Sequence, residues 1–408
     1  MPVASQASAA EQIVARDHQK VVRNYGRYQL VVNRAEGVYL YGEDGRTYLD
    51  FLSGIGVMAL GHSHPRVVAA ITDQIGTLVH CSNLYYHPLQ GEVAQLLSEL
   101  SGLERTFFCN SGSEAVEAAL KIAKGYGRSR SGGKTEIVAL HNSFGGRTLG
   151  AISVTGQPKY REPFEPVIPG VRFIAPNDLG ALEAAVGEKT AGIVFEPILG
   201  EGGIIEISAD FAGLARKLAT DHDALLICDE VQCGMGRTGD TFAFHHWGAD
   251  FLPDVITLAK PLAAGLPIGA VVCSEAAATV LAPGMHGSTF GGGALACRVA
   301  REFLGMLPEL LPHVRDVSAY FRAQLASLAA GYDFVGGLHG RGLMVGLELS
   351  IPGGGFVPRA QELGLLMNCT AGNVLRFLPP FVIEREHVDE AVGALDQVFS
   401  QVPPDATA

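Results

Sequence analysis

Short apolar runs alternate with helix-like patterns through the middle of the chain, from about residue 62 to 285. Continuous apolar runs of this length are typical of strands that are buried on both faces of a parallel sheet. The expected strands are residues 105–109, 136–141, 192–195, 224–228 and 254–259. The alternation predicts an α/β fold with a mostly parallel central sheet flanked by helices.

Both ends of the chain lack this alternation. Before residue 62, three short runs read as strands separated by Gly-containing turns, namely 28–32, 38–41 and 47–51. From residue 294 onward, helical patterns come first and strands later, and the expected elements are helices at 294–306 and 314–330, strands near 342–349 and 374–377, and a last helix at 386–399.

We therefore expect three pieces. Residues 62–294 form a large domain, and residues 295–408 form a smaller α+β domain. Residues 1–61 are too few to build a core of their own, so we expect them to pack with the small domain.

Composition narrows the class of protein. The 408 residues are 48% hydrophobic and carry a dispersed net charge of −12, which argues against nucleic acid as a partner. The seven cysteines form no Cys-x-x-Cys pair, so we predict no metal site and expect free thiols in a reducing compartment. Charges at residues 11–23 occupy the place of a signal-peptide core, and the uncharged stretch 261–273 is too short to span a bilayer. A cytoplasmic protein without a membrane partner is expected.

Three chemical signals follow the carboxyl ends of expected central strands, where open α/β sheets bind their ligands. The first is the segment Asn110 to Glu114, in which small residues precede a helix. Free backbone N–H groups at such a position can hold a phosphate. Taken alone, Ser113 could equally be an ordinary N-cap.

The second signal is Asp229-Glu230 after the strand 224–228, and the third is Lys260 after the strand 254–259. Each also has a plain structural reading: an acid can cap the next helix, and a lysine can extend its ammonium group to solvent. Together, the three signals fit a ligand with a phosphate, a basic ring nitrogen and an aldehyde. Pyridoxal 5'-phosphate has these parts, and a desolvated lysine amine can capture its aldehyde.

The chain resembles the class III aminotransferases over nearly its whole length. The motifs that carry the resemblance are NSGSEA (110–115), SFGGRT (143–148), EPILGEGG (196–203), DEVQ (229–232), LAK (258–260) and GSTFGG (287–292). The resemblance implies the fold of type I pyridoxal-phosphate enzymes and a homodimer with its active sites at the interface. SNLYY (82–86), PKYREPF (158–164) and GNVLRF (372–377) are most similar to the members that act on N-acetylornithine and on lysine-biosynthetic intermediates.

The resemblance also implies a role for each cofactor contact. Lys260 would carry the cofactor and Asp229 would keep its ring nitrogen protonated, and these two are the expected catalytic residues. The other implied cofactor-binding residues are Ser111, Gly112 and Ser113 near the phosphate, Phe144 and Val231 on the two ring faces, Gln232 at the ring hydroxyl, the motif residue Glu230, and Thr289, which together with Ser288 would reach the partner's cofactor phosphate.

For the substrates, the resemblance implies that Arg147 binds the α-carboxylate and that Arg376 binds a second carboxylate when Glu201 releases it. Ser288 is also placed among the substrate-binding residues. The implied reaction moves the terminal amino group of N-acetylornithine to 2-oxoglutarate. Succinylornithine, 4-aminobutyrate and an N-modified lysine intermediate are alternative donors, an aminomutase is a further possibility, and a non-catalytic pyridoxal-phosphate-binding regulator is the alternative from another class.

Some residues depart from the family's frequent pattern. The departures that bear on donor choice are Leu199 in place of Gln, Gly145 in place of His, Gly293-Ala294 in place of Asn-Pro, Pro261 and Ala263-Ala264 after the lysine, and Ile55 where free-ornithine enzymes have Tyr. The Ile55 departure makes activity on free ornithine a less favoured expectation.

Overall fold

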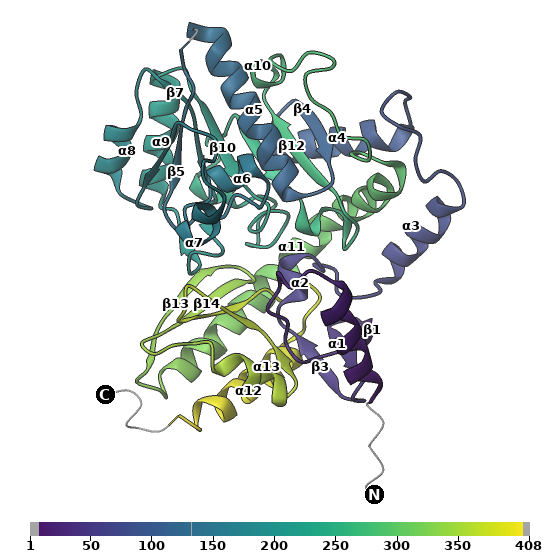
Figure 1. The fold of residues 1–408 in the computed structure, drawn as a ribbon. Helices are drawn as coiled ribbons and strands as arrows, with labels where there is room; N and C mark the ends of the chain where they lie inside the picture. The colour runs from purple at the N-terminus through teal and green to yellow at the C-terminus, as the bar shows by residue number, and fades with distance from the viewer. Residues whose placement is uncertain (1–7, 132, 403–408) are drawn as a thin grey trace, which may run out of the picture.

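The computed structural model describes residues 8–131 and 133–402. It forms two masses joined by the long helix α11 (Ala294–Ala329), with the larger one built on a central sheet (Figure 1). The first seven residues of the polar N-terminal stretch lie outside the described residues. Within residues 8–131 and 133–402, no helix is long and apolar enough to cross a membrane.

The central sheet has seven strands in the order β4-β12-β11-β10-β7-β5-β6. Only β12 runs antiparallel to its neighbours, and the other adjacent pairs are parallel. The strands are β4 (Arg105–Cys109), β5 (Glu136–Leu140), β6 (Val171–Ile174), β7 (Thr190–Phe195), β10 (Leu225–Asp229), β11 (Val255–Leu258) and β12 (Gly269–Cys273). The five expected strands are confirmed to within two residues at either end, whereas β6 and β12 were not expected.

Alternate residues of these strands face opposite layers, as the pleat of a strand requires. In β10, Leu225 and Ile227 belong to a buried cluster with helix α5 (Gly112–Ser131), whereas Leu226 and Cys228 belong to the cluster beneath α9 (Ala209–Asp221). Both faces of the sheet are therefore buried, which explains why its strands are continuously apolar.

The two chain ends share the smaller mass. A four-stranded sheet has the order β1-β2-β3-β15, and β15 pairs with β3 in parallel although more than 300 residues separate them. A second sheet has the order β13-β14-β17-β16. These strands are β1 (Val32–Glu36), β2 (Tyr39–Gly42), β3 (Thr47–Asp50), β13 (Val335–Arg341), β14 (Met344–Leu349), β15 (Leu365–Leu366), β16 (Asn368–Thr370) and β17 (Val374–Phe377). The domain limits stay a prediction.

Two expectations at the chain ends were wrong. The first N-terminal strand is β1, which starts where the expected strand at 28–32 ends. The two expected helices after residue 294 are one helix, α11, which continues through Pro308 and Pro312. Helix α11 packs against α3 (Pro65–Ile75), α4 (Pro88–Ser101) and α13 (Arg385–Phe399), and these contacts hold it together across the two prolines.

The remaining elements are short and mostly connect the larger ones. They are α1 (Ala9–Lys20), α2 (Ser53–Gly56), α6 (Leu149–Ser153), α7 (Pro158–Arg161), α8 (Leu179–Ala185), α10 (Glu275–Ala278), α12 (Phe356–Glu362), β8 (Ile198–Leu199) and β9 (Ile205–Glu206), with 3₁₀ turns η1 (Glu162–Phe164), η2 (Ala243–Trp247) and η3 (Lys260–Ala263).

Candidate active site

A cavity of about 180 Å³ lies at the carboxyl edge of the central sheet. Its lining comes from the segments that follow β4, β5, β7, β10 and β11, so five strand ends converge on it. The lining residues are Ser111, Gly112, Ser113, Phe144, Gly145, Gly146, Glu196, Asp229, Val231, Gln232, Ala259 and Lys260. A larger cavity of about 430 Å³ lies near Tyr28 and is mostly apolar. The smaller cavity brings together acids, an amine and a helix start, so it is the candidate site.

The start of helix α5 forms one wall. Ser111 caps the helix, because its Oγ accepts a hydrogen bond from the Glu114 amide at 3.2 Å, so reading Ser113 as the N-cap was wrong. Ser113 lies in the first turn, and its Oγ accepts from the Arg147 amide at 3.1 Å. A Cβ on Gly112 would lie 2.8 Å from Val231 Cγ1, so only glycine fits here. The positive end of a 20-residue helix therefore faces the cavity.

Asp229 is the last residue of β10 and is 6% exposed. Its Oδ1 accepts hydrogen bonds from Thr257 Oγ1 at 2.8 Å and from the Val231 amide at 3.1 Å. Burial raises the pKa of this carboxyl to about 6, although both hydrogen bonds favour the charged form. A cationic group placed in the cavity would favour the carboxylate.

Lys260 follows β11 and lines the same cavity. Burial and the nearby positive charge of Arg376 lower the pKa of its amine to about 8. A larger fraction of the amine is then neutral near pH 7 than for an exposed lysine, as a nucleophile or proton acceptor requires.

Glu196 is a lining residue to which the sequence reasoning assigned no role. Its Oε1 accepts from the Phe144 amide at 2.9 Å and its Oε2 accepts from the Gly200 amide at 3.1 Å. Burial, with the Asp229 charge beside it, raises the pKa of Glu196 to about 8. A partial signal was present in the sequence, because Glu196 directly follows the expected strand 192–195. Only the structure shows that this strand, β7, lies beside β10.

Arg376 and Glu201, two of the proposed substrate residues, contact each other at the edge of the cavity. Arg376 lies on β17, is 1% exposed, and donates to Glu201 Oε1 at 2.6 Å, Gly200 O at 3.1 Å and Asn368 Oδ1 at 3.0 Å. It also donates to Gln232 Oε1 at 3.3 Å, which links the pair to the cavity. Burial acts to raise the pKa of Glu201, but the positive charge and the hydrogen bond of Arg376, together with the charges of Lys260 and Lys159, lower that pKa overall.

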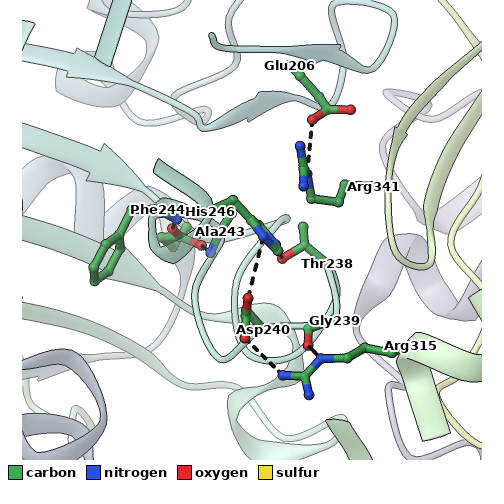
Figure 2. Close-up of polar contacts among 10 residues, drawn as sticks. Glu206, Thr238, Gly239, Asp240, Ala243, Phe244, His246, Arg315 and Arg341 are labelled. Carbon is green, nitrogen blue, oxygen red and sulfur yellow. Dashed lines mark hydrogen bonds and ion pairs between the residues drawn. The ribbon is translucent and has the colours of Figure 1, made fainter. Parts of the chain in front are cut away.

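Glu230 does not line the cavity. Its buried carboxylate accepts from the amides of Ala243 and Phe244 at 2.9 and 2.8 Å and so fixes the start of η2. The loop ahead of η2 has its own polar network, in which His246 contacts Thr238 and Asp240 and Arg315 binds Asp240 (Figure 2). The structure therefore gives Glu230 a structural contact outside the cavity lining, and its role toward a cofactor stays a prediction.

Ser288 and Thr289 also lie outside this cavity. Ser288 Oγ accepts from Asn110 Nδ2 at 2.9 Å, and Thr289 is exposed. Arg147 is exposed at the rim of the site, where its guanidinium lies over the Tyr160 ring. Of the predicted site residues, the structure thus gathers Ser111, Gly112, Ser113, Phe144, Asp229, Val231, Gln232 and Lys260 in one cavity.

The sequence is similar to known proteins over nearly its whole length. Residues 21–399 match the sequence model of the family described as aminotransferase class-III. The chain is 46% identical to the acetylornithine aminotransferase of Aquifex aeolicus, covering 93% of this chain and 99% of the relative. It is 47% identical to that of Methanocaldococcus jannaschii, covering 93% and 95%.

Solved structures show the same fold. An acetylornithine aminotransferase from Elizabethkingia anophelis superimposes with a TM-score of 0.87 at 31% identity, covering 97% of this chain and all of that one. An ornithine aminotransferase from Toxoplasma gondii, described with partial occupancy of PLP at its active site, gives 0.93 at 33% identity, covering 99% and 97%.

Proposed function

The chain belongs to the class-III aminotransferases and is a pyridoxal-phosphate-dependent transaminase, and we propose that it moves the terminal amino group of N-acetylornithine to 2-oxoglutarate. The observation that carries this choice is identity of 40–47% to several acetylornithine aminotransferases over more than nine-tenths of the chain. The products are N-acetylglutamate semialdehyde and glutamate.

The cavity fits pyridoxal phosphate by the chemistry of its walls. Gly112 and Ser113 offer backbone N–H groups at a helix start for the phosphate, Asp229 offers an acid for the ring nitrogen, and Lys260 offers an amine for the aldehyde. When bound, the cofactor supplies an electrophilic carbon that captures amines and a protonated ring that accepts electrons from the substrate carbon. Phe144 and Val231 would contact the ring, and Gln232 its hydroxyl.

Lys260 would act twice. Its Nζ would hold the cofactor, and as a free amine it would accept the proton that leaves the substrate carbon and later donate it. The lowered pKa of Lys260, about 8, suits a group that must both accept and donate a proton near neutral pH. Asp229 would supply the carboxylate for the ring nitrogen.

Arg147 and Arg376 would divide the substrate carboxylates between them. The guanidinium of Arg147 binds the α-carboxylate of both substrates through its planar fork. Arg376 stays paired with Glu201 while the amine donor is bound, and it binds the second carboxylate of 2-oxoglutarate once Glu201 moves aside. The 2.6 Å Arg376–Glu201 contact supports the paired arrangement that we propose for donor binding.

Ser288 and Thr289 would complete the active site of a second copy of this chain, so we propose a homodimer as the catalytic unit. The seven cysteines are all free, which supports a reducing, cytoplasmic location.

A panel of amine donors with 2-oxoglutarate, followed as glutamate formed, tests the proposal. We expect N-acetylornithine to give the highest kcat/KM, ahead of succinylornithine, 4-aminobutyrate, free ornithine and N-modified lysine. A higher kcat/KM for any of the others would replace N-acetylornithine as the donor and leave the family assignment intact.

A further inference from the structure

Aromatic rings, rather than hydrogen bonds, hold the guanidinium of Arg147. Its Cζ lies 4.0 Å from the centre of the Tyr160 ring and 5.3 Å from the centre of the Phe144 ring. The two rings meet edge to face, with centres 6.1 Å apart at 89°. Phe144 lines the cavity, and Tyr160 contacts Phe144 without itself lining the cavity.

This packing leaves the hydrogen-bonding edges of the guanidinium unused. Among residues 8–131 and 133–402, no acceptor or carboxylate lies within bonding distance of the Arg147 side chain. Arg376 differs, because Glu201, Gly200, Asn368 and Gln232 already occupy its donors. A cation held by its flat face keeps its planar fork free for an incoming carboxylate.

Tyr160 is itself firmly placed. It lies on α7, and the next residue, Arg161, donates to Thr155 O at 2.9 Å and stacks over Phe173 at 4.6 Å. Gln157, just before α7, donates to Asn142 O at 3.4 Å. In the described part of the chain, the Tyr160 hydroxyl has no hydrogen-bond partner, so the ring is the part of this side chain that makes contacts.

We propose that Tyr160 is a positioning residue for substrate binding: its ring orients the Arg147 guanidinium so that the fork meets the α-carboxylate of each substrate. The inference rests on the proposed role of Arg147. Tyr160 is not among the residues that line the cavity, so the role proposed for it is exerted through Arg147. Lys159 adds a second positive charge, with its Nζ 4.7 Å from the same ring, and so strengthens the attraction of this rim for anions.

The test compares Tyr160→Leu with Tyr160→Phe in the holoenzyme. Leucine removes the ring, and phenylalanine keeps it and removes only the unpartnered hydroxyl. We expect Tyr160→Leu to raise KM for both substrates roughly 3- to 30-fold with a smaller change in kcat, because binding is lost equally in the ground and transition states. Tyr160→Phe keeps the ring, so its KM should stay within about twofold of the value for the unmodified enzyme.

A binding measurement without turnover separates the two proposals. Glutarate has both carboxylates of 2-oxoglutarate but no keto group, so its Kd can be measured by calorimetry. A double-mutant cycle with Arg147→Met then asks whether Tyr160 acts through Arg147. We expect Tyr160→Leu to weaken glutarate binding in the parent enzyme and to have no further effect in Arg147→Met.

Phe173→Leu is the matched control. It removes the β6 ring that stacks with Arg161, the residue after Tyr160, and leaves the contacts of Arg147 intact. Unchanged glutarate binding in Tyr160→Leu, an equal loss in Phe173→Leu, or a further loss in the Arg147→Met background would each overturn the positioning role. If Arg147→Met itself binds glutarate normally, the role of Arg147 in the proposed function falls as well.

Discussion

Three titratable side chains share one small cavity, and burial shifts the pKa of each in the direction that favours the neutral form of the group. The pKa of Asp229 rises to about 6, that of Glu196 rises to about 8, and that of Lys260 falls to about 8. Such clustering of perturbed groups is common where proton transfer occurs. The sequence could point to Asp229 and Lys260 because each follows a buried strand. It could not show that Glu196 joins them, because that depends on β7 lying next to β10.

Lys260 should be the residue that carries the cofactor. Borohydride reduction of the holoenzyme followed by peptide mapping should place the cofactor on Lys260, and Lys260→Met should yield no labelled peptide. Lys159, an exposed lysine near the site, is the internal control and should stay unlabelled. A label on any other lysine would refute the assignment.

Glu196 should make stability depend on pH. Its folded pKa of about 8 lies above the ordinary value of 4.5, so between these values the folded protein binds more protons than the unfolded chain. The stabilising contribution is complete below about pH 4.5 and is lost as the pH rises through about 8. Glu196→Gln cannot ionise, so relative to the parent it should gain roughly 2 to 4 kcal/mol between about pH 5 and pH 8.5.

Thermal unfolding of both holoenzymes across this pH range measures that difference. Glu183→Gln, which removes one exposed carboxylate, is the matched control. A constant difference in Tm between Glu196→Gln and the parent at every pH would mean that Glu196 is already ionised in the folded state.

At the scale of elements, the apolar runs were enough to predict the five strands that build the site, because strands buried on both faces leave a continuous signature. The pattern was less informative where tertiary contacts override local preference. Helix α11 continues through Pro308 and Pro312, which alone would end a helix. At the segment Ser53 to Gly56, four successive residues have positive φ, including Ile55 at 62°. A β-branched residue rarely adopts that conformation, so no sequence pattern predicts it.

The contact between the start of α5 and the segment after β10 should control cofactor affinity. Gly112→Ala would place its Cβ 2.8 Å from Val231 Cγ1, so one of the two walls must move. We expect the Kd for pyridoxal phosphate, followed by fluorescence, to rise roughly tenfold or more. Val231→Ala in the same chain should recover part of the loss, because it removes the methyl groups in conflict.

Gly213→Ala provides the matched control, since Gly213 lies within α9 and nothing is near its missing Cβ. It should leave cofactor affinity unchanged. If Gly112→Ala binds the cofactor normally, the helix start does not approach the cofactor as proposed.

At the scale of the whole molecule, exposed apolar side chains gather on two neighbouring segments. Leu84, Tyr85 and Tyr86 are 84%, 70% and 104% exposed, and Phe290 is 68% exposed. Asn83 ties the segments together, because its Nδ2 donates to Ser288 O at 2.9 Å and Gly291 O at 3.0 Å. Large exposed apolar residues on adjoining segments mark an interaction surface. Thr289 lies on the same surface, so this face is where the proposed homodimer would bring in a second copy of the chain.

A shared active site predicts complementation between two inactive variants. Lys260→Met lacks the amine, and Thr289→Glu would place a negative charge where the proposed homodimer would hold the partner's cofactor phosphate, so each homodimer should be inactive. In a mixed dimer, one site combines both defects, and the other combines the intact Lys260 of one chain with the intact Thr289 of the other. Because about half of the dimers are mixed and each has one intact site, co-expression should restore about a quarter of parental activity. If mixed dimers are verified and activity does not recover, each chain completes its own active site.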